Sequence, residues 1–431
     1  MKSIWNSNIK ELKFNQLQGD IKTDVLIIGG GMCGIICAYM LKNAGVDCVL
    51  AEADKICAGI SNSTTAKITF QHGLIYDKIT NKYGTEKAYL YYDSQREALE
   101  KIKSIASEID DFQICNSYVY SLKDRGVIER EVEALNKIGC SAEFCEKTEL
   151  PFGVKGAVKV SDQAKLHPLK FAYAIAKDLK IYENTKILEL KKQTAITTNG
   201  RIFAKKVIVA THFPFINKHG GYFLKMYQHR SYVIALKNAE NIKDMYVDEA
   251  KDGLSFRSHK DLLLLGGGSH RTGSVGGGWE ELRKVKEKYY PYSREEKFWA
   301  TQDCMTLDSI PYIGRYSKAT QDLYVATGFN KWGMTSSMVS AMILTDMICG
   351  RKNKYEDVYS PSRTVFHTQL AVNAFESAKN LLTPTTPRCP HMGCALKYNK
   401  EEHSWDCPCH GSRFEENGNI INNPATDDMK K

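Results

Sequence analysis

The chain has 431 residues, 43% hydrophobic and 25% charged, which are the proportions of an ordinary globular protein with room for two or three domains. Its 59 lysines and arginines outnumber its 50 acidic residues, for a formal net charge of +9, but they are scattered, so we expect no nucleic-acid partner. The N-terminus has no apolar segment of the kind found in secretory signals, so we expect a cytoplasmic protein.

The first recognisable unit, residues 23–52, is predicted to be a buried strand, a glycine turn, a helix and a second strand. Its glycines have the spacing G-x-G-x-x-G. Gly29 permits the tight turn, Gly31 lets the backbone approach a pyrophosphate, and Gly34 lets helix and strand pack closely. The N-terminus of the helix would then present free N–H groups to the phosphates. The unit therefore predicts a dinucleotide-binding βαβ fold.

Glu52 stands at the end of the second strand, where a carboxylate can accept hydrogen bonds from a ribose. An acid at this place favours FAD or NAD over NADP. The alternative for this region is a membrane segment, because residues 25–41 carry no charge. That run is short and rich in glycine, and Asp24 borders it, so we predict no transmembrane segment.

The loop that follows, residues 53–73, is polar and rich in serine and threonine, and we expect it to run along the cofactor. Thr64, Thr65 and Lys67 are its candidate contacts. The alternative is a capped surface loop, because serine and threonine often serve as caps.

The chain then leaves the nucleotide fold and returns to it. Amphipathic patterns predict helices over 85–109 and 127–140, and a proline near the start fits a helix over 167–179. Three short strands follow, the last of which is the apolar run VIVAT at 207–211. Such a run is typical of a buried parallel strand, so the nucleotide-binding domain is predicted to be discontinuous.

Residues 213–305 are predicted to form a mixed sheet with strands at 231–236, 254–258 and 262–268 and a helix over 278–290. Several of its side chains could face a substrate, although an ordinary structural role competes for each of them and the sequence does not rank them. They are His229, Arg230, Arg257, His270, Arg271 and Trp299.

After DSIPYIG at 308–314, the residues 323–348 predict another strand, a glycine turn and a long apolar helix. Gly328 and Gly333 bracket the turn, and the helix begins near Met334. In a flavoprotein, the N-terminus of such a helix can stabilise the negative charge of a reduced isoalloxazine.

The G-x-G-x-x-G motif with its acid, the strand VIVAT, and D-x-x-P-x-x-G before a glycine turn and helix together resemble the D-amino-acid oxidase and glycine oxidase family of flavoproteins. The resemblance covers residues 20–350. It implies an α/β fold, with a Rossmann-like FAD-binding domain and a mixed-sheet substrate domain. It also implies hydride transfer to flavin N5 from a carbon bearing an amine.

Carried over by position, the resemblance implies contacts along the whole cofactor. They are Gly29, Gly31, Gly34 and Glu52 for the ADP half, Thr65, Ala66 and Lys67 for the pyrophosphate, Ile187 for adenine, and Gly328, Gly333 and Met334 for the flavin ring.

One position departs from the family pattern. Amino-acid oxidases of this family often carry an arginine shortly before D-x-x-P to bind the substrate carboxylate, and here that place is Asp303. A carboxylate would repel an amino acid's carboxylate and attract an ammonium. Asp303 is therefore the substrate-side candidate, and the hypothesis is a cationic amine substrate. No general base is assigned.

Four of the chain's 13 cysteines fall between residues 389 and 409, beside two histidines, while the others are scattered and are interpreted as reduced core thiols. The pattern C-x-H-x-G-C-x12-C-x-C-H-G-S resembles the two boxes of a Rieske [2Fe–2S] domain. By position, Cys389 and Cys407 would bind one iron, and His391 and His410 the other.

The same resemblance implies that Cys394 and Cys409 match the pair that forms a disulfide in cytochrome bc-type Rieske domains. The competing interpretation of the cluster is a Cys2His2 zinc site, although structural zinc ligands are usually two to four residues apart, and Cys389 and His391 are closer than that.

The cluster module is shorter than the domain it resembles, which has several strands before its first box: here residues 352–388 are predicted to be linker and helix. Either the cluster loops pack directly on the flavoprotein, or the module has lost strands and binds its cluster poorly. The predicted division is 1–75, 151–212 and 306–350 for the FAD-binding domain, 76–150 and 213–305 for the substrate domain, 351–388 for linker and helix, and 389–431 for the Rieske-type module.

A flavin accepts two electrons as hydride and a [2Fe–2S] cluster accepts one, so the pair can convert hydride chemistry into single-electron transfer. The function predicted is an FAD-dependent amine or amino-acid dehydrogenase that passes electrons to the cluster and then to an unknown one-electron acceptor. The alternatives are an oxygen-dependent oxidase with a vestigial cluster module, and a non-enzymatic redox-sensing or electron-carrier protein.

Overall fold

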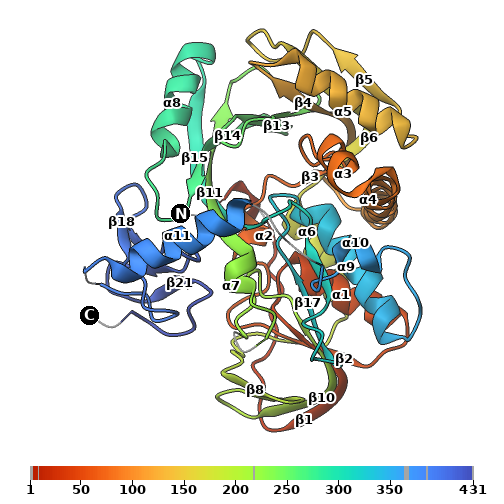
Figure 1. Ribbon diagram of the computed structural model, residues 1–431, viewed down its shortest axis with the longest axis vertical. Helices are drawn as coiled ribbons and strands as arrows, with labels where there is room; N and C mark the ends of the chain where they lie inside the picture. The colour runs from red at the N-terminus through yellow and green to blue at the C-terminus, as the bar shows by residue number, and fades with distance from the viewer. Residues whose placement is uncertain (1–2, 8, 217–218, 364–367, 385–386, 430–431) are drawn as a thin grey trace.

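The computed structural model describes residues 3–7, 9–216, 219–363, 368–384 and 387–429, which form three sheets with helices packed around them (Figure 1). The first sheet lies at one end of the molecule and the second at the other, and the small third sheet stands to one side with the C-terminus (Figure 1).

The first sheet has the strand order β16-β17-β10-β1-β2-β7, with parallel pairing from β17 to β7. Helices α1 (Met32–Asn43) and α9 (Gly333–Ile348) pack against each other beside it. Its strands are β1 (Ile21–Ile28), β2 (Cys48–Ala51), β7 (Ile181–Tyr182), β10 (Arg201–Val209), β16 (Tyr312–Arg315) and β17 (Leu323–Thr327), with β8 (Glu189–Lys191) and β9 (Thr194–Ile196) attached to β10. Residues 207–209 of the apolar run are thus the end of a central parallel strand beside β1, and the first sheet is built from stretches of chain that are far apart in the sequence.

The second sheet is mixed and has the order β15-β11-β14-β13-β12-β4-β6-β3, with β5 attached to β6. Its strands are β3 (Lys67–Ile68), β4 (Gln113–Ser121), β5 (Ala142–Cys145), β6 (Gly156–Lys165), β11 (Met226–Lys237), β12 (Met245–Asp248), β13 (Ser255–His259), β14 (Leu262–Arg271) and β15 (Arg294–Thr306). Its helices are α3 (Tyr76–Tyr83), α4 (Thr85–Ala106), α5 (Arg125–Lys137) and α8 (Gly278–Tyr289).

Several of these strands differ from the sequence-based expectation. The pattern predicted no strand at β4, β6 or β15, although β15 spans 13 residues and pairs along β11. β6 lies in the second sheet, whereas residues 151–212 were predicted to belong with the first. Strand β15 carries charged residues among its apolar ones, which hides it from a search for hydrophobic alternation.

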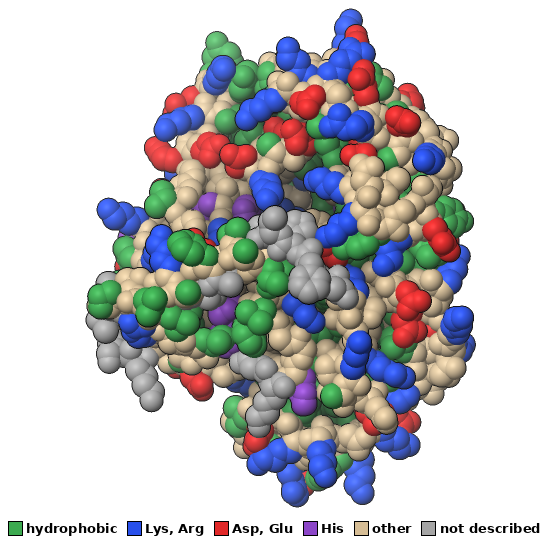
Figure 2. All heavy atoms as spheres, in the orientation of Figure 1, with side chains coloured by type: hydrophobic (Ala, Val, Ile, Leu, Met, Phe, Trp, Pro, Cys, Tyr) green, Lys and Arg blue, Asp and Glu red, His purple; other side chains and the backbone are tan. Residues whose placement is uncertain are grey.

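The third sheet is antiparallel, with the order β18-β19-β20-β21. Its strands are β18 (Lys397–Asn399), β19 (Ser404–Asp406), β20 (Arg413–Glu415) and β21 (Ile420–Asn422), and α11 (Thr368–Leu382) precedes it in the chain. Hydrophobic side chains gather over α11 on the face shown in Figure 2. The remaining helices are η1 (Ile4–Asn6), α2 (Ile60–Ser63), α6 (Pro168–Ala176), α7 (Tyr222–Lys225) and α10 (Glu356–Tyr359).

Across the described ranges, no helix combines the length and the apolar character that crossing a lipid bilayer requires.

Candidate functional site

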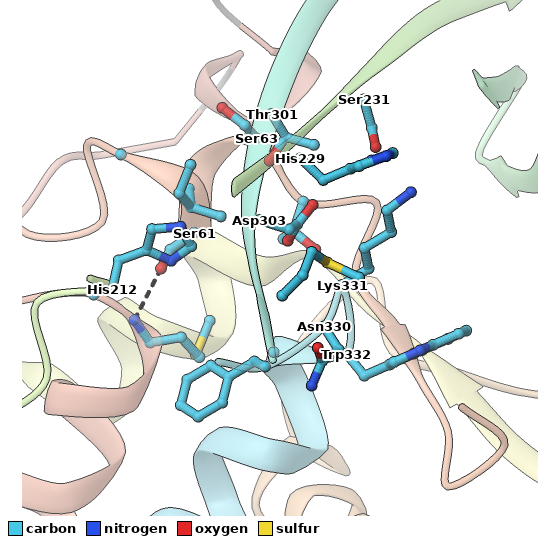
Figure 3. Close-up of a pocket in the computed structure, with 18 of the residues that line it drawn as sticks. Ser61, Ser63, His212, His229, Ser231, Thr301, Asp303, Asn330, Lys331 and Trp332 are labelled. Carbon is cyan, nitrogen blue, oxygen red and sulfur yellow. Dashed lines mark hydrogen bonds between the residues drawn. The ribbon is translucent and has the colours of Figure 1, made fainter. Parts of the chain in front are cut away.

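A cavity of about 1530 Å³ is lined by residues from all three sheets. Single small-molecule sites occupy roughly 300–1,000 Å³, so the space suits a dinucleotide together with a substrate. Gly29, Gly31 and Glu52 line it from the βαβ unit, and Gly333 and Met334 line it from the start of α9. Figure 3 shows part of it, with side chains from β11, β15 and the turn before α9 pointing toward a common space.

The glycine turn has the geometry that a nucleotide fold requires. Gly29 has a φ of +109°, and a Cβ built on Gly34 would lie 1.9 Å from the carbonyl oxygen of Gly29. A Cβ on Gly31 would meet only the Ser61 Oγ, at 3.4 Å. The first helical N–H, from Met32, donates to the same Ser61 Oγ at 2.8 Å (Figure 3). Gly34 therefore serves close packing, while Gly31 leaves the turn open toward the cavity, as a pyrophosphate would need.

Glu52 is held at the cavity edge by backbone N–H groups. Its Oε2 accepts a hydrogen bond from the Gly30 N–H at 2.5 Å, and its Oε1 accepts one from the Asp54 N–H at 2.9 Å. Burial raises the pKa of the Glu52 carboxyl above its ordinary value. These bonds fix the carboxylate beside the space where a ribose is expected.

The other residues predicted to contact FAD divide into two groups. Those that line the cavity are Gly29, Gly31, Glu52, Thr65, Lys67, Ile187, Gly333 and Met334. Those that lie behind its surface are Gly34, Ala66 and Gly328. At Gly328, where φ is +72°, a Cβ would lie 2.3 Å from the Thr306 side chain, so this glycine shapes the turn before α9.

Lys67 lies in the serine- and threonine-rich loop and reaches the cavity. Its Nζ donates to the Thr65 Oγ1 at 3.2 Å. Burial and the neighbouring Arg257 guanidinium lower the pKa of Lys67 to about 7. Arg257 itself donates to the carbonyl oxygens of Ala66 at 2.7 Å and Leu166 at 3.2 Å, which fixes the loop from behind.

Strands β11 and β15 form one wall of the cavity. His229 pairs with Asp303, and Ser231 pairs with Thr301, in the antiparallel register of the two strands. All four line the cavity and lie close together in Figure 3. The Nδ1 of His229 and the Oγ1 of Thr301 are buried and have no hydrogen-bond partner among the residues that the structure describes. Buried polar atoms normally have partners, so this wall has groups available to a bound ligand.

Asp303 and its neighbours set the charge of this wall. Burial raises the pKa of Asp303 to about 6, against the opposing effect of the Lys331 ammonium and the Arg230 guanidinium. Burial lowers the pKa of His229 to about 3. At neutral pH the site therefore holds an ionised carboxylate beside a neutral imidazole. The Lys331 ammonium lies near both groups and acts on the pKa of each, and its Nζ donates to the Ser269 Oγ at 3.3 Å.

Among the six candidates that the sequence did not rank, His229 faces the cavity with the groups above. Trp299 is a core residue whose indole N–H donates to the Ser63 carbonyl at 2.9 Å, and Arg257 holds the loop described above. His270 stacks on Tyr232. The remaining two, Arg230 and Arg271, contact the C-terminal module, and Arg230 also lines the cavity.

Two residues were missed by the sequence-based search. Lys331 lies inside the glycine turn that the motif had already marked, between the two glycines that define it. His212 lines the cavity three residues after the end of β10. Its Nε2 is buried and has no partner among the described residues, and burial lowers its pKa to about 4. Its place beyond the carboxyl end of a parallel strand, where ligands bind in such folds, was the available signal.

The two cysteine–histidine boxes fold as a matched pair of loops. The N–H of Gly393 donates to the Cys389 carbonyl, and the N–H of Gly411 donates to the Cys407 carbonyl, each at 2.9 Å. Both glycines have positive φ, 76° and 86°, which such a turn needs. Like spacing in the two boxes thus produces like backbone geometry in the two loops.

The loops bring the predicted cluster ligands together. The rings of His391 and His410 lie 5.0 Å apart at 86°. Burial lowers their pKa values to about 4 and about 3, which keeps both rings neutral, as metal ligation requires. The Nδ1 of His410 is buried and has no hydrogen-bond partner. Cys389 and Cys407 are buried beside them, so the donor set fits a cluster held half by sulfur and half by imidazole.

The disulfide implied for Cys394 and Cys409 is not formed in this structure, where both are free thiols. Their sulfurs and that of Cys407 lie within 4.8 Å of one another. The two residues face each other across the cluster loops, as the resemblance implied, but as reduced side chains.

The module packs directly on the second sheet, which is the first of the two arrangements left open by the sequence. The Gln228 Nε2 on β11 donates to the carbonyl oxygens of His410 at 3.0 Å and Asn423 at 2.9 Å. The Gln302 Nε2 on β15 donates to the Gly411 carbonyl at 2.8 Å and to the Gln228 Oε1 at 2.5 Å. Both glutamines are buried, so the second cluster loop is fixed by fully used carboxamides.

A buried chain of ion pairs forms a second anchor. The Arg230 Nε on β11 donates to the Glu402 Oε1 at 2.9 Å. Glu402 also accepts from the Arg413 Nη2 at 2.9 Å, and the Arg413 Nε donates to the Asp406 Oδ1 at 2.9 Å. Each of these four side chains is at most 9% exposed. Arg271 adds bonds to the carbonyls of Pro408 and Cys409 at 3.2 and 3.3 Å.

Comparison with known families divides the chain into two parts at the end of α9. Residues 24–347 match the family of FAD-dependent oxidoreductases that includes the D-amino-acid oxidases, and residues 349–431 match the Rieske [2Fe-2S] domain. The second match includes α11, which lies in the stretch 351–388 that was predicted to be linker and helix.

Two curated relatives and two solved structures show the range of the similarity. The putative Rieske 2Fe-2S iron-sulfur protein YhfW of Bacillus subtilis is 33% identical over 100% of this chain and 97% of its own length. Gamma-glutamylputrescine oxidoreductase of Escherichia coli is 22% identical over 80% of this chain and 88% of its own. Glycine oxidase from Geobacillus kaustophilus superposes with a TM-score of 0.66 at 17% identity, covering 80% of this chain and 100% of its own. L-proline dehydrogenase from P. horikoshii gives 0.67 at 18%, covering 80% and 98%.

Proposed function

The chain belongs to the FAD-dependent oxidoreductase family and carries a C-terminal Rieske [2Fe–2S] domain, and from that premise we propose that it is an amine or amino-acid dehydrogenase that delivers electrons to its own cluster. When bound, FAD supplies hydride acceptance and the cluster supplies single-electron acceptance. A further one-electron acceptor, whose identity is open, would then receive the electrons.

The observation that carries the proposal is the position of the two sites on opposite faces of the same two strands. On β11, His229 lines the cavity, and the preceding residue, Gln228, donates to the carbonyl of the cluster-loop residue His410. On β15, Asp303 lines the cavity, and Gln302 next to it donates to Gly411. Because successive side chains of a strand point to opposite faces, His229 and Asp303 face the cavity and Gln228 and Gln302 face the cluster loops across a single layer of sheet.

The substrate proposed is a cationic amine. Asp303 presents a carboxylate where amino-acid oxidases of this family often carry an arginine, and its pKa of about 6 leaves it ionised at neutral pH. The named relatives support a carbon–nitrogen substrate in general, since they include an oxidoreductase of γ-glutamylputrescine, a glycine oxidase and a proline dehydrogenase. Lys331, whose ammonium lies near Asp303, would accommodate an oxygen-bearing group on the same molecule.

An oxygen-dependent oxidase with a vestigial cluster remains the second candidate, because several structural relatives are named as oxidases. Against it stand the predicted cluster ligands Cys389, Cys407 and His410, which are all buried, and the two polar anchors, which a module without a role would not need. An electron carrier without substrate chemistry is opposed by the unpartnered polar groups on the cavity wall.

The test is an anaerobic screen of amines and amino acids that follows flavin bleaching and cluster reduction in the same sample. A dehydrogenase of amines is expected to show both changes with a cationic amine and to form little hydrogen peroxide in air. One equivalent of peroxide per turnover with an unreduced cluster would favour the oxidase. Failure of every amine and amino acid to bleach the flavin would favour the carrier.

A further inference from the structure

The last strand of the cluster module and the residues after it reach the nucleotide side of the cavity. Residues 420–426 supply six of its lining side chains or backbone groups, and the same cavity is lined by Gly31, Glu52 and Ile187 of the predicted nucleotide site. We propose that this segment is the outer wall of the FAD site, so that the cluster module retains the flavin cofactor as well as receiving its electrons.

Hydrogen bonds attach the segment to the nucleotide fold on two sides. The Asn423 Nδ2 donates to the carbonyl oxygens of Thr211 at 2.8 Å and Phe213 at 2.7 Å, in the loop that directly follows β10. The Lys186 Nζ donates to the Thr426 carbonyl at 2.6 Å, next to the predicted adenine contact Ile187. The segment therefore spans the cavity from the end of a central strand of the nucleotide sheet to the adenine side.

Ile421 presents an apolar surface within this wall. Its side chain is 43% exposed and lines the cavity beside polar neighbours. An isoleucine left uncovered by protein at the edge of a nucleotide cavity can pack against the face of an aromatic ring, which removes apolar surface of both groups from water. This placement gives the segment a contact surface for the cofactor in addition to its hydrogen bonds.

Asn423 also joins the FAD wall to the cluster loop. Its carbonyl accepts a hydrogen bond from the Gln228 Nε2, which donates in addition to the carbonyl of His410. One buried carboxamide thus fixes a cluster ligand's backbone and the FAD wall together. Binding of the cluster is expected to order the loop that carries His410, which is bonded to Gln228, and through Gln228 and Asn423 to strengthen the binding of FAD. By linkage, bound FAD then strengthens the binding of the cluster by the same factor.

The experiment measures FAD release from the holoprotein without substrate, as the rise of flavin fluorescence after dilution. Asn423→Ala removes two hydrogen bonds and is expected to speed release about tenfold, and Ile421→Ser, which leaves those bonds in place, about threefold. Asn419→Ala is the matched control, because this exposed asparagine on the turn before β21 is bonded only within its own hairpin. It should release FAD at the wild-type rate.

Visible circular dichroism of the same samples reports whether the cluster is intact. Equal release from wild type, Asn423→Ala and Ile421→Ser, with intact clusters, would overturn the proposal. If Asn423→Ala loses its cluster, the rate of FAD release from Ile421→Ser alone decides whether the proposal holds. Cys389→Ser, which removes a predicted cluster ligand outside residues 420–426, should also speed release, and an unchanged rate would overturn the linkage. Because no turnover is involved, failure of the proposed dehydrogenase activity leaves these outcomes readable.

Discussion

The two faces of the β11–β15 wall differ in how far the polar side chains named here are hydrogen-bonded to other protein groups. On the cavity face, the His229 Nδ1 and the Thr301 Oγ1 are buried, and neither has a hydrogen-bond partner within the described part of the chain. On the module face, the amide hydrogens of Gln228 and Gln302 all go to oxygen atoms, and the Thr272 Oγ1 donates to the Gln302 Oε1 at 3.1 Å. A face with open polar groups is prepared for a ligand that comes and goes, whereas a satisfied face is a permanent contact.

The largest effect on stability is expected when a buried charged group is removed from the contact between the module face and the C-terminal module. Glu402→Ala leaves the buried Arg230 and Arg413 guanidinium groups without their shared carboxylate. Breaking a buried ion pair from one side costs about 3–5 kcal/mol of the free energy of unfolding. Thermal unfolding should therefore show a large drop in midpoint, with early loss of the cluster chromophore. Glu416→Ala is the control: its carboxyl is exposed on the same module, and its loss should change stability by less than about 0.5 kcal/mol.

On the open face, Asp303→Asn should weaken catalysis without harming the fold. Loss of one bond to a charged group lowers kcat/KM for a cationic amine by about 10- to 100-fold. Because the Asp303 carboxyl is neutral below its pKa of about 6, kcat/KM of the wild type should rise with pH through that value, and the variant should lack this rise. Ionisation of a buried carboxyl opposes folding, so the variant should also be at least as stable at pH 7.

One outcome would contradict the prediction for Asp303. If a simple amino acid is turned over equally well by wild type and by Asp303→Asn while cationic amines are ignored by both, the carboxylate does not select the substrate. The exposed Asp261→Asn, on the hairpin between β13 and β14, is the matched control for the loss of one acidic group.

A smaller effect is expected at Gln228. Gln228→Leu leaves the carbonyls of His410 and Asn423 and the Gln302 amide without one partner each, at a cost of about 1–3 kcal/mol in the free energy of unfolding. The cluster's electron paramagnetic resonance spectrum should shift, because the backbone beside a ligand is released. An unchanged spectrum would mean that the glutamine only fills space. Gln193→Leu, at an exposed position, should change neither property.

The smallest effects are expected at two buried threonines, one with a hydrogen-bonded hydroxyl and one whose hydroxyl has no partner among the described residues. Thr272→Val on the satisfied face removes a buried hydrogen bond and should cost about 1 kcal/mol of the free energy of unfolding. Thr301→Val on the open face removes a hydroxyl that has no partner and should be neutral or slightly stabilising. Denaturant unfolding measures both. Equal costs would mean that the two faces do not differ as described.

The sequence allowed the nucleotide turn and both cluster boxes to be predicted, because in each case the chemistry depends on residues close together in the chain. The spacing around Gly31 and the two boxes with His391 and His410 specify local backbone geometry directly. The FAD contacts themselves, including Ile187 and Lys67, stay predictions whose positions at the cavity agree with the expected role.

The wall between the two sites could not be predicted in the same way. Gln228 and His410 are 182 residues apart in the chain, and an isolated glutamine on a strand has no local pattern that marks it as a docking group. Strand β15, which carries Gln302 and Asp303, was missed because its charged residues interrupt the hydrophobic alternation. Which face of a strand meets which partner is decided by tertiary packing, and one sequence does not contain that information in readable form.

The most direct test of the central claim, that electrons cross the β11–β15 wall from the flavin to the cluster, is an anaerobic titration with a cationic amine substrate. Each substrate molecule gives two electrons, the flavin holds two and the cluster holds one, so full reduction should need about 1.5 equivalents per chain, with the signal of the reduced cluster appearing. A His410→Ala variant without cluster should need about 1.0 equivalent. A wild-type end point at about 1.0 equivalent with the cluster still oxidised would contradict the claim.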